Sequence, residues 1–452
     1  MSGLAFVWLA VLLVIFVRSL IDLVSISSNV LWLKRNKKTS SIDRSTRYVI
    51  CIPALYEQDI IVDTLDRMLS LDYPKNQVDI YVVTTNKEQK HGTSSTTKEV
   101  VEKYKSLLPG DDKARLHMLN YPKANGRMAH QINYAATHAA DFLKEDNCYF
   151  VVYNADSIIK PDALVVVNET INNIRKQKEH YPRILQQSAV YSYDSEDRWF
   201  ESSIAKGAAM HQSRWTLTHE LTRLRKQSRN IEKLRGDSAL NSVMYAKIAH
   251  CVGHGLFVQG QHYLKNPLPT DILNEDLPYG LMQCALRNEI HPLPTLELAT
   301  SPVRLMNLYK QKTVWFNPFF EFHACIKNLL ATGDYKSRFE VYLLGIQAYV
   351  TMFIWLLHSV LWNIGLVLSI LLGWQYLLLW AVAFVCYWVI PSIIYHIYIK
   401  GQAIYSCFSI SSLLLGSLYV LSHSTGPVLC TVKWATAGIT GIRPTKPKTV
   451  ST

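Results

Sequence analysis

The sequence lacks closely spaced cysteines. Its eight cysteines are scattered over 452 residues and form no C-x-x-C pair, standing at positions 51, 148, 251, 284, 325, 386, 407 and 430. Because structural zinc sites draw their ligands from such pairs, the sequence predicts no zinc site. The scattered pattern favours reduced thiols with structural roles.

The basic residues are also not gathered into one stripe with aromatic side chains, although the formal net charge is +12. Nucleic-acid recognition depends on such a basic footprint, so the sequence predicts no nucleic-acid partner. Loops that face anionic lipid on the inner side of a membrane explain the charge better.

The N-terminal segment has no convincing signal-peptide cleavage site. Residues 5–33 form a long hydrophobic segment, and residues 5–24 reach the roughly 20 residues that a membrane span needs, despite Arg18 and Asp22. We therefore expect a retained transmembrane anchor over residues 1–34. The alternative is a buried helix of a soluble protein.

Basic residues next to the hydrophobic segments predict the orientation, since they favour the cytoplasmic side. Lys34, Arg35, Lys37 and Lys38 follow the first segment, and Lys336 and Arg338 precede the C-terminal ones. We therefore expect a multi-pass cell-membrane protein whose soluble part is cytosolic. About four helices are expected within 340–442, at 342–372, 375–398, 403–421 and a weaker, interfacial or re-entrant stretch at 424–442, before a cytosolic tail at 443–452.

The intervening region, 45–315, reads as strands that alternate with helices. Apolar strands are expected at 48–54, 78–85, 148–156 and 184–191, with a helix at 59–71. This order predicts a Rossmann-like α/β domain with a parallel sheet and helices on both faces, next to an α-helical transmembrane region. Helical segments at 197–236 and 316–335 are expected under the sheet or at the membrane interface, the latter as an amphipathic interface helix.

Polar residues at strand ends carry the candidate chemistry, because ligands bind beyond the carboxyl ends of parallel strands. Asn154 and Asp156 end the third strand, where a carboxylate could hold a divalent metal ion. The alternative is an Asx residue that only caps a turn. Glu275 and Asp276 precede an apolar helix, either as a cap or as a general base for a hydroxyl group.

Two further segments have a structural and a functional interpretation. Trp315, four residues after Gln311, is either an interfacial membrane anchor or a stacking platform for a sugar ring. Gly253 and His254 stand in a Gly-His-Gly segment, which allows close approach to a ligand or only makes a tight turn.

Taken in order, these segments resemble the family 2 inverting glycosyltransferases of the GT-A fold, in particular the membrane-integrated branch with cellulose, chitin and hyaluronan synthases. The resemblance covers about 48–316 by motif and the C-terminal spans by architecture. The matching segments are 53–57 for the opening strand and donor loop, 123–135 for the Lys/Gly-rich segment, 154–156 for Asp-x-Asp, 274–276 for Thr-Glu-Asp and 311–315 for Gln-x-x-Arg-Trp.

The resemblance implies a role for each matching residue. Asp276 would be the catalytic base, Glu275 would orient it or the acceptor, and Mg²⁺ or Mn²⁺ would bind through Asp156 and Asn154. Acceptor binding would fall to Trp315, Gln311, Gly253 and His254. Donor binding would fall to Pro53, Tyr56, Glu57, Thr85, Lys123, Arg127, Asn154 and Asp156.

The implied reaction is hexosyl transfer from a nucleotide-diphosphate sugar, with a UDP-sugar favoured, to a carbohydrate acceptor or nascent polymer at the lipid membrane. A β-linked polysaccharide would leave through the chain's own transmembrane channel. One alternative is non-processive transfer to a lipid-linked acceptor. Another is a transporter or receptor with a degenerate, non-catalytic transferase domain.

Three positions depart from the family pattern. Asn154 replaces a carboxylate, Val314 replaces the Arg before Trp, and Thr84-Thr85 stands where relatives carry an Asp near the nucleobase. Neutralisation of the diphosphate must therefore come from Lys310, Lys312 or elsewhere.

Overall fold

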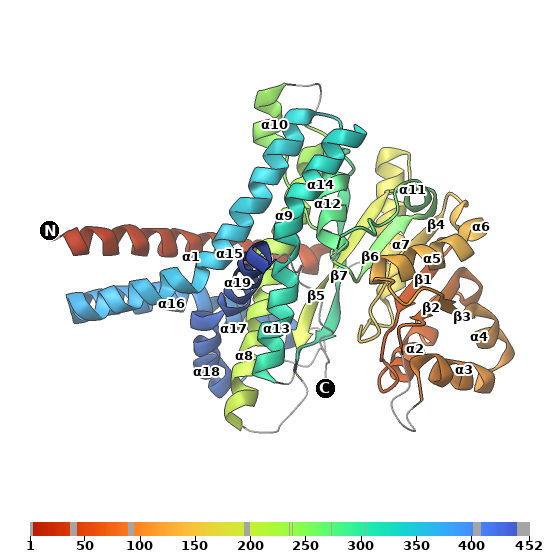
Figure 1. Cartoon of the computed structure of the whole chain (residues 1–452), viewed down its shortest axis with the longest axis horizontal. Helices are drawn as coiled ribbons and strands as arrows, with labels where there is room; N and C mark the ends of the chain where they lie inside the picture. Colours follow the sequence, from red (N-terminus) through yellow and green to blue (C-terminus); the bar gives the residue numbers. More distant parts are fainter. Residues whose placement is uncertain are drawn as a thin grey trace.

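The computed structural model describes most of the chain: residues 3–36, 43–88, 95–193, 199–400 except 235, 237, 273 and 303, and 408–440. The expected tail at 443–452, Lys37, Lys38 and Cys407 lie outside these residues. A sheet with its covering helices forms one end of the molecule, and α1 and α16 project from the other (Figure 1).

The sheet has seven strands in the order β3-β2-β1-β4-β6-β5-β7. Strands β3, β2, β1 and β4 are parallel, β5 is parallel to β7, and β6 is antiparallel to both of its neighbours. The strands are β1 (Arg47–Pro53), β2 (Val78–Thr85), β3 (Leu116–Tyr121), β4 (Cys148–Val152), β5 (Ile184–Ser192), β6 (Leu256–Gln259) and β7 (Ile290–Thr300).

The expected α/β class is confirmed, whereas the expectation of a parallel sheet is wrong at β6. Leu256, the first residue of β6, pairs with Val152, the last residue of β4. The chain therefore re-enters the sheet at the edge where the parallel strands end. This reversal brings Gly253 and His254, which precede β6, to the carboxyl ends of β1 and β4.

Helices cover both faces of the sheet because alternate residues of a strand point to opposite sides. Val49 and Cys51 pack in one core with α5, while Ile50 and Ile52 pack in the other with α2 and α7. The helices around the sheet are α2 (Ile61–Leu69), η1 (Lys75–Gln77), α3 (Thr97–Leu107), α4 (Gly110–Arg115), α5 (Met128–His138), α6 (Ala140–Leu143), α7 (Ala163–Lys178), α11 (Gly260–Lys265) and α12 (Asp276–Ala285).

A second group of helices joins the sheet to the long apolar helices. It comprises α8 (Trp199–Trp215), the π-helical turn η2 (Thr216–Glu220), α9 (Leu221–Ile231), α10 (Ala239–Tyr245), α13 (Leu305–Phe316) and α14 (Pro318–Thr332). Helix α8 packs on β5 and on α18 (Ile410–Ser422). Gly207 and Gly416 permit this crossing, since a Cβ on Gly416 would lie 2.7 Å from Cα of Gly207.

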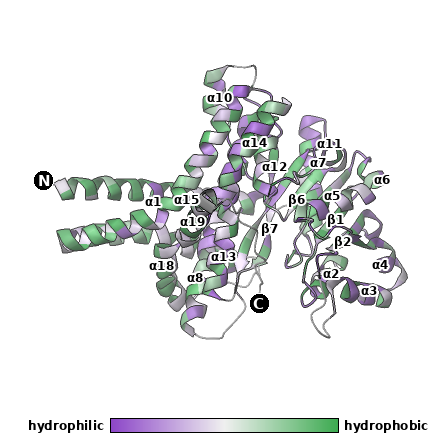
Figure 2. Cartoon of the chain, viewed as in Figure 1, coloured by the Kyte–Doolittle hydropathy of each residue, from purple (hydrophilic) through white to green (hydrophobic). Residues whose placement is uncertain are grey.

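Four helices among the described residues are long and apolar enough to cross a membrane: Gly3–Asn36, Arg338–Leu372, Trp374–Lys400 and Ile410–Ala437. Hydrophobic residues dominate the two projecting helices (Figure 2). The first of these is α1 and the second is α15. The third is continuous through α16 (Trp374–Phe384), the π-helical turn η3 (Val385–Val389) and α17 (Ile390–Lys400). The expected stretches at 403–421 and 424–442 together supply only the fourth, through α18 and α19 (Thr425–Thr440).

Helix α1 is tied to α8, η2 and α9 by polar side chains in its second half. Arg214 of α8 forms a fully buried ion pair with Asp22, with 3.1 Å between Nη1 and Oδ2. Asn29 donates hydrogen bonds to the carbonyl of Leu217 and, over 2.8 Å, to the hydroxyl of Thr222. The buried ion pair with Arg214 explains why an aspartate is present in this apolar segment. The hydrogen bond from Asn29 to Leu217 holds α1 against η2.

Candidate active site

A single cavity of about 1450 Å³ runs from the carboxyl ends of β1, β2 and β4 to helices α1 and α15. Every residue assigned to the site from the sequence lines it except Lys123, which lies outside the lining. Lys123 is exposed at the loop before α5, whereas Arg127, the N-cap of that helix, lines the cavity.

One end of the cavity, the predicted donor end, is built where three parallel strands finish. Pro53 ends β1, Thr85 ends β2, and Asn154 follows β4 by two residues. Their registers bring these ends together, since Pro53 pairs with Val83 and Cys51 with Val152. The three strand ends therefore line one part of the cavity, where ligand binding is expected in a sheet of this kind.

The segment after β4 makes a turn and also faces the cavity. The backbone N–H of Asn154 donates to Oγ of Ser157 over 3.0 Å, and the N–H of Ser157 donates back to the carbonyl of Asn154 over 3.2 Å. Because these bonds use backbone atoms of Asn154, its side-chain amide is not consumed by the turn. Burial raises the pKa of Asp156, and the nearby carboxylate of Glu297 acts in the same direction.

Asp276 is held by two backbone N–H groups at the start of α12. Its Oδ2 accepts from Gly253 over 2.9 Å, and its Oδ1 accepts from Leu277 over 2.8 Å. A Cβ on Gly253 would lie 3.3 Å from that Oδ2 and 3.5 Å from Cε of Met128. The Gly-His-Gly segment therefore positions the candidate base, beyond making a turn.

The segment 274–276 is hydrogen-bonded to the segment that carries Trp315. The side-chain amide of Asn274 donates to the carbonyl of Val314 over 2.8 Å. The ring of Trp315 lies 6.0 Å from that of Tyr191, centroid to centroid, and both line the cavity. Trp315 thus faces the same space as Asp276, next to the long helices.

Lys312 does not point toward the donor end. Its side chain is buried, its Nζ lies 3.5 Å from the centroid of Trp315, and it donates to Oε1 of Gln212 over 2.8 Å. Burial lowers its pKa well below the ordinary value. Lys310 is exposed and lies outside the lining, so neither lysine faces the space beside Asp156.

His254 forms a buried pair with a carboxylate from β7. Its Nδ1 lies 3.0 Å from Oε2 of Glu297, which is almost fully buried. Burial disfavours the charged imidazole, but the Glu297 carboxylate outweighs this and raises the pKa of His254 to about 9. The pair with Glu297 therefore favours the charged form of this imidazole.

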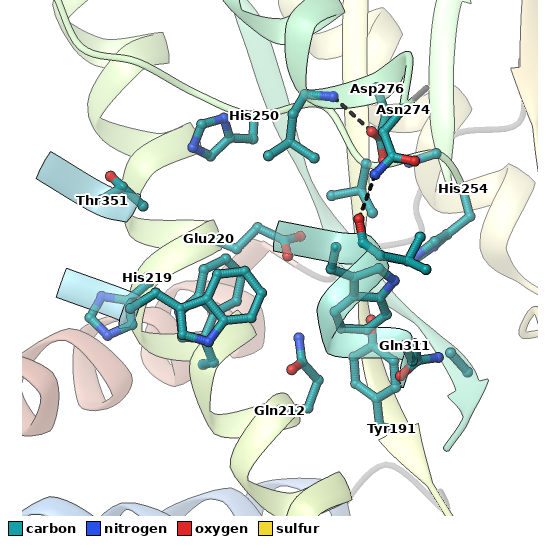
Figure 3. A pocket seen from close by; sticks show the side chains of 18 of the residues that line it. Tyr191, Gln212, His219, Glu220, His250, His254, Asn274, Asp276, Gln311 and Thr351 are labelled. Atoms are coloured by element: carbon teal, nitrogen blue, oxygen red, sulfur yellow. Dashed lines mark hydrogen bonds between the residues drawn. The ribbon is translucent and has the colours of Figure 1, made fainter. Parts of the chain in front are cut away.

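Several residues that sequence reasoning missed also line the cavity. Glu220 ends the π-helical turn, and it lies between His219 and Thr351 on one side and Asp276 and His254 on the other (Figure 3). Its Oε1 is buried without a hydrogen-bond partner, and burial raises its pKa to about 7. π-helical turns are frequent at functional sites, but a lone Glu in a basic helical segment gives no such signal.

The side-chain oxygen atoms at the end of β4 suit a divalent metal ion that also coordinates a substrate. Among the described residues, no group of three or more His, Cys, Asp and Glu side chains could enclose a metal ion. Mg²⁺ is commonly held by one or two carboxylates together with substrate phosphates, so a closed protein cage is not needed. The carboxylate of Asp156 with the amide oxygen of Asn154 fits this mode of binding.

Three solved structures align with the chain at low similarity. Mannosyltransferase PcManGT from Pyrobaculum calidifontis, in complex with GDP-Man and Mn²⁺, aligns over 94% of this chain and 98% of its own, with 15% identity and a TM-score of 0.45. S. aureus TarS 1-349 aligns over 88% of this chain and 92% of its own, with 11% identity and a TM-score of 0.35. The same fragment with UDP-GlcNAc aligns over 86% and 92%, with 11% identity and a TM-score of 0.33.

At these TM-scores the alignments establish neither the fold nor the function of this chain. No protein-family model matches the chain, and no curated protein sequence matches it.

Proposed function

We propose that the chain is an inverting glycosyltransferase of the GT-A fold, embedded in the cell membrane by several spans, with its catalytic domain in the cytosol. The observation that carries this proposal is the shared cavity. Asp276 and Trp315 line it together with Asp156 and the ends of β1 and β2. A base, an aromatic platform and a phosphate-binding edge are the parts that sugar transfer needs.

In the proposed reaction, an acceptor hydroxyl oxygen attacks the anomeric carbon of a nucleotide-diphosphate sugar. The hydroxyl proton passes to the carboxylate of Asp276 as the new C–O bond forms. The bond between the anomeric carbon and the diphosphate breaks, and its electron pair leaves with the nucleotide diphosphate. The two N–H groups that hold Asp276 keep its carboxylate in place, and Glu275 at the helix N-cap orients it or the acceptor.

The donor binds at the ends of β1, β2 and β4, along Pro53, Tyr56, Glu57 and Thr85. Arg127 and Lys87 line this end, and their positive charges would neutralise the diphosphate. They would replace the family's Arg before Trp, where this chain has Val314. Asp156, with Asn154, would hold Mg²⁺ or Mn²⁺, which supplies positive charge for the departing diphosphate when bound. A UDP-sugar is the favoured donor. Lys123 lies outside the lining, but its backbone carbonyl accepts from Oγ1 of Thr85 over 3.5 Å, which keeps it beside the donor.

The acceptor sugar stacks on Trp315, with Gln311 nearby. Elongation of a β-linked polysaccharide is supported by the volume of the cavity and by the aromatic rings that line it, among them Tyr191, Trp215 and Trp355. Export through the chain's own helices would require side chains to move, because the outer part of the bundle is packed. Trp8 donates to Ser369 over 2.7 Å, and the rings of Trp362 and Trp380 lie 5.8 Å apart.

Transfer to a lipid-linked acceptor is the second candidate. It is supported by the apolar residues of α1 and α15 at the other end of the same cavity. The same Asp276 would serve both acceptors, and the size of the product distinguishes them.

The test is to incubate the purified chain with a panel of nucleotide sugars and Mn²⁺, with and without lipid acceptors. Release of the nucleotide diphosphate from one donor, followed by sizing of the product, is the expected result. Asp271→Asn, which changes a carboxylate on the loop before α12 whose Oδ2 accepts from Asn328 over 3.3 Å, is a matched control for Asp276→Asn. Silence across the whole panel would favour a non-catalytic transporter or receptor.

A further inference from the structure

The membrane end of the cavity is open to the level of the lipid tails. Leu13, Val17 and Ile21 of α1 line it on one side, and Val350 and Ile354 of α15 line it on the other. Each of these side chains is at the same time exposed. A molecule with an apolar tail could therefore enter between α1 and α15 without passing through water.

Two guanidinium groups face this end without a carboxylate partner. Arg223 of α9 donates to the hydroxyl of Thr351 over 3.2 Å, while its Nη1 is buried without a hydrogen-bond partner. Nε of Arg18 is likewise buried and unpartnered. Both arginines line this cavity. Burial lowers the pKa of Arg223 to about 10, and the charge of Arg18 acts in the same direction.

The carboxylates at this end do not neutralise the arginines. Asp22 is occupied by Arg214 at 3.1 Å and by Nε2 of His219 at 3.3 Å. Arg18, Arg214 and Arg223 stand against Asp22 and Glu220, which leaves a net charge of +1 when both carboxylates are ionised (3 − 2 = 1). Buried charges are normally paired, so this excess of positive charge favours the binding of an anion.

We propose that this end binds the phosphate of a lipid phosphate, whose tail lies between α1 and α15 and whose attached sugar reaches Asp276. The phosphodiester that joins a lipid to a sugar carries one negative charge and two non-bridging acceptor oxygens, which match the net charge of +1 and the two guanidinium groups. Glu220 lies on the path from Thr351 to Asp276 (Figure 3), where its unpartnered oxygen can accept from a sugar hydroxyl. This proposal rests on the proposed transfer reaction and specifies its acceptor.

The direct test is equilibrium binding of farnesyl phosphate to the full chain in phosphatidylcholine nanodiscs, with farnesol and inorganic phosphate as separate ligands. Farnesyl phosphate is expected to bind at least about tenfold more tightly than either, since charge-assisted hydrogen bonds and tail burial both contribute. Equal affinity for inorganic phosphate would overturn the lipid assignment. Equal affinity for farnesol would overturn the phosphate site.

Substitutions of Arg223 and Arg18 test whether these two residues bind the phosphate. Arg223→Gln and Arg18→Gln are each expected to weaken farnesyl phosphate about tenfold or more, and Arg223→Lys less. Arg225→Gln is the matched control, because Arg225 lies on the same helix but packs over Trp32 and lies outside the lining. An unchanged affinity in Arg223→Gln and Arg223→Lys, with a normal gel-filtration profile, would refute the site.

Nucleotide-sugar binding to the same samples separates this proposal from the transfer reaction. A chain that binds nucleotide sugar with Mn²⁺ but not farnesyl phosphate would refute only the lipid phosphate site. Arginine-dependent binding of farnesyl phosphate without any nucleotide-sugar binding would support the site and refute the transferase.

Discussion

The carboxylate of Asp276 and the backbone N–H of Gly253 are joined by a hydrogen bond of 2.9 Å. A residue of α12 is thereby fixed by the loop before β6, so two elements that are separate in sequence set the position of the proposed catalytic base. The close contact leaves little room at Gly253, where a Cβ would meet Oδ2 at 3.3 Å.

Gly253→Ala is therefore expected to shift the carboxylate by a few tenths of an ångström and to lower turnover by about tenfold, because small misplacements of catalytic groups are costly. The measurement is the steady-state rate of nucleotide diphosphate release. Gly110→Ala, where an added Cβ meets nothing within 4 Å, is the control. Wild-type turnover in Gly253→Ala would show that this contact does not set the base.

Trp315 is expected to act on the acceptor and not on the donor. Trp315→Ala should raise the KM for the acceptor about fivefold, since a lost stacking contact is worth about 1 kcal/mol. Trp315→Phe should retain most of the affinity because it keeps an aromatic face. A change in nucleotide-sugar affinity without a change in acceptor KM would contradict this assignment.

The buried carboxyl of Glu220 should make stability depend on pH. Burial raises its pKa from 4.5 to about 7, so on going from pH 4.5 to about 7 the unfolded chain releases this proton before the folded chain does. The group therefore lowers stability as the pH rises through this range, by roughly 3 kcal/mol in full.

Glu220→Gln cannot ionise, so its thermal midpoint should exceed that of the wild type at about pH 8 and match it at about pH 4. Thermal unfolding across this range measures the difference. Asp141→Asn, which alters a carboxylate with 97% side-chain exposure, should follow the wild type throughout. A constant offset between Glu220→Gln and the wild type would argue against a raised pKa.

Metal removal should weaken donor binding. Chelation is expected to reduce the affinity for the nucleotide diphosphate by about tenfold or more, and Mn²⁺ should restore it, because the ion and Asp156 share the phosphates. Asp156→Asn should lose most of this metal dependence. Calorimetric titration with and without Mn²⁺ measures both, and tight binding that is insensitive to chelation would exclude this role for Asp156.

The sequence predicts the strands that are buried on both faces, because apolar residues predominate in them. These strands are β1, β2, β4 and β5, although Gln186, Gln187 and Ser188 interrupt the apolar run of β5. The missed strands have weaker patterns: β3 and β7 are edge strands, the first largely half-buried and the second with Pro292 and Pro294, and β6 has only four residues. Proline is tolerated at an edge, where no neighbour needs its missing N–H.

The residues of the candidate site also fall into those that the sequence predicts and those that it does not. Pro53, Thr85 and Asp156 could be found because strand ends and motif order place them together. Glu220 and Arg223 could not, since a helix reveals which side chain faces a cavity only after its packing is known. Glu297 was also missed, because it lies in an edge strand whose pairing could not be read from the sequence.

The most direct test of the proposed function compares Asp276→Asn with the wild type in single-turnover transfer from the donor that the panel identifies. Asparagine keeps an oxygen for the Gly253 N–H but cannot take a proton. We predict that donor affinity stays within about twofold, while the transfer rate falls about a hundredfold to ten-thousandfold, the range typical for loss of a general base. An Asp276→Asn protein that transfers sugar at the wild-type rate would contradict the assignment of Asp276 as the catalytic base.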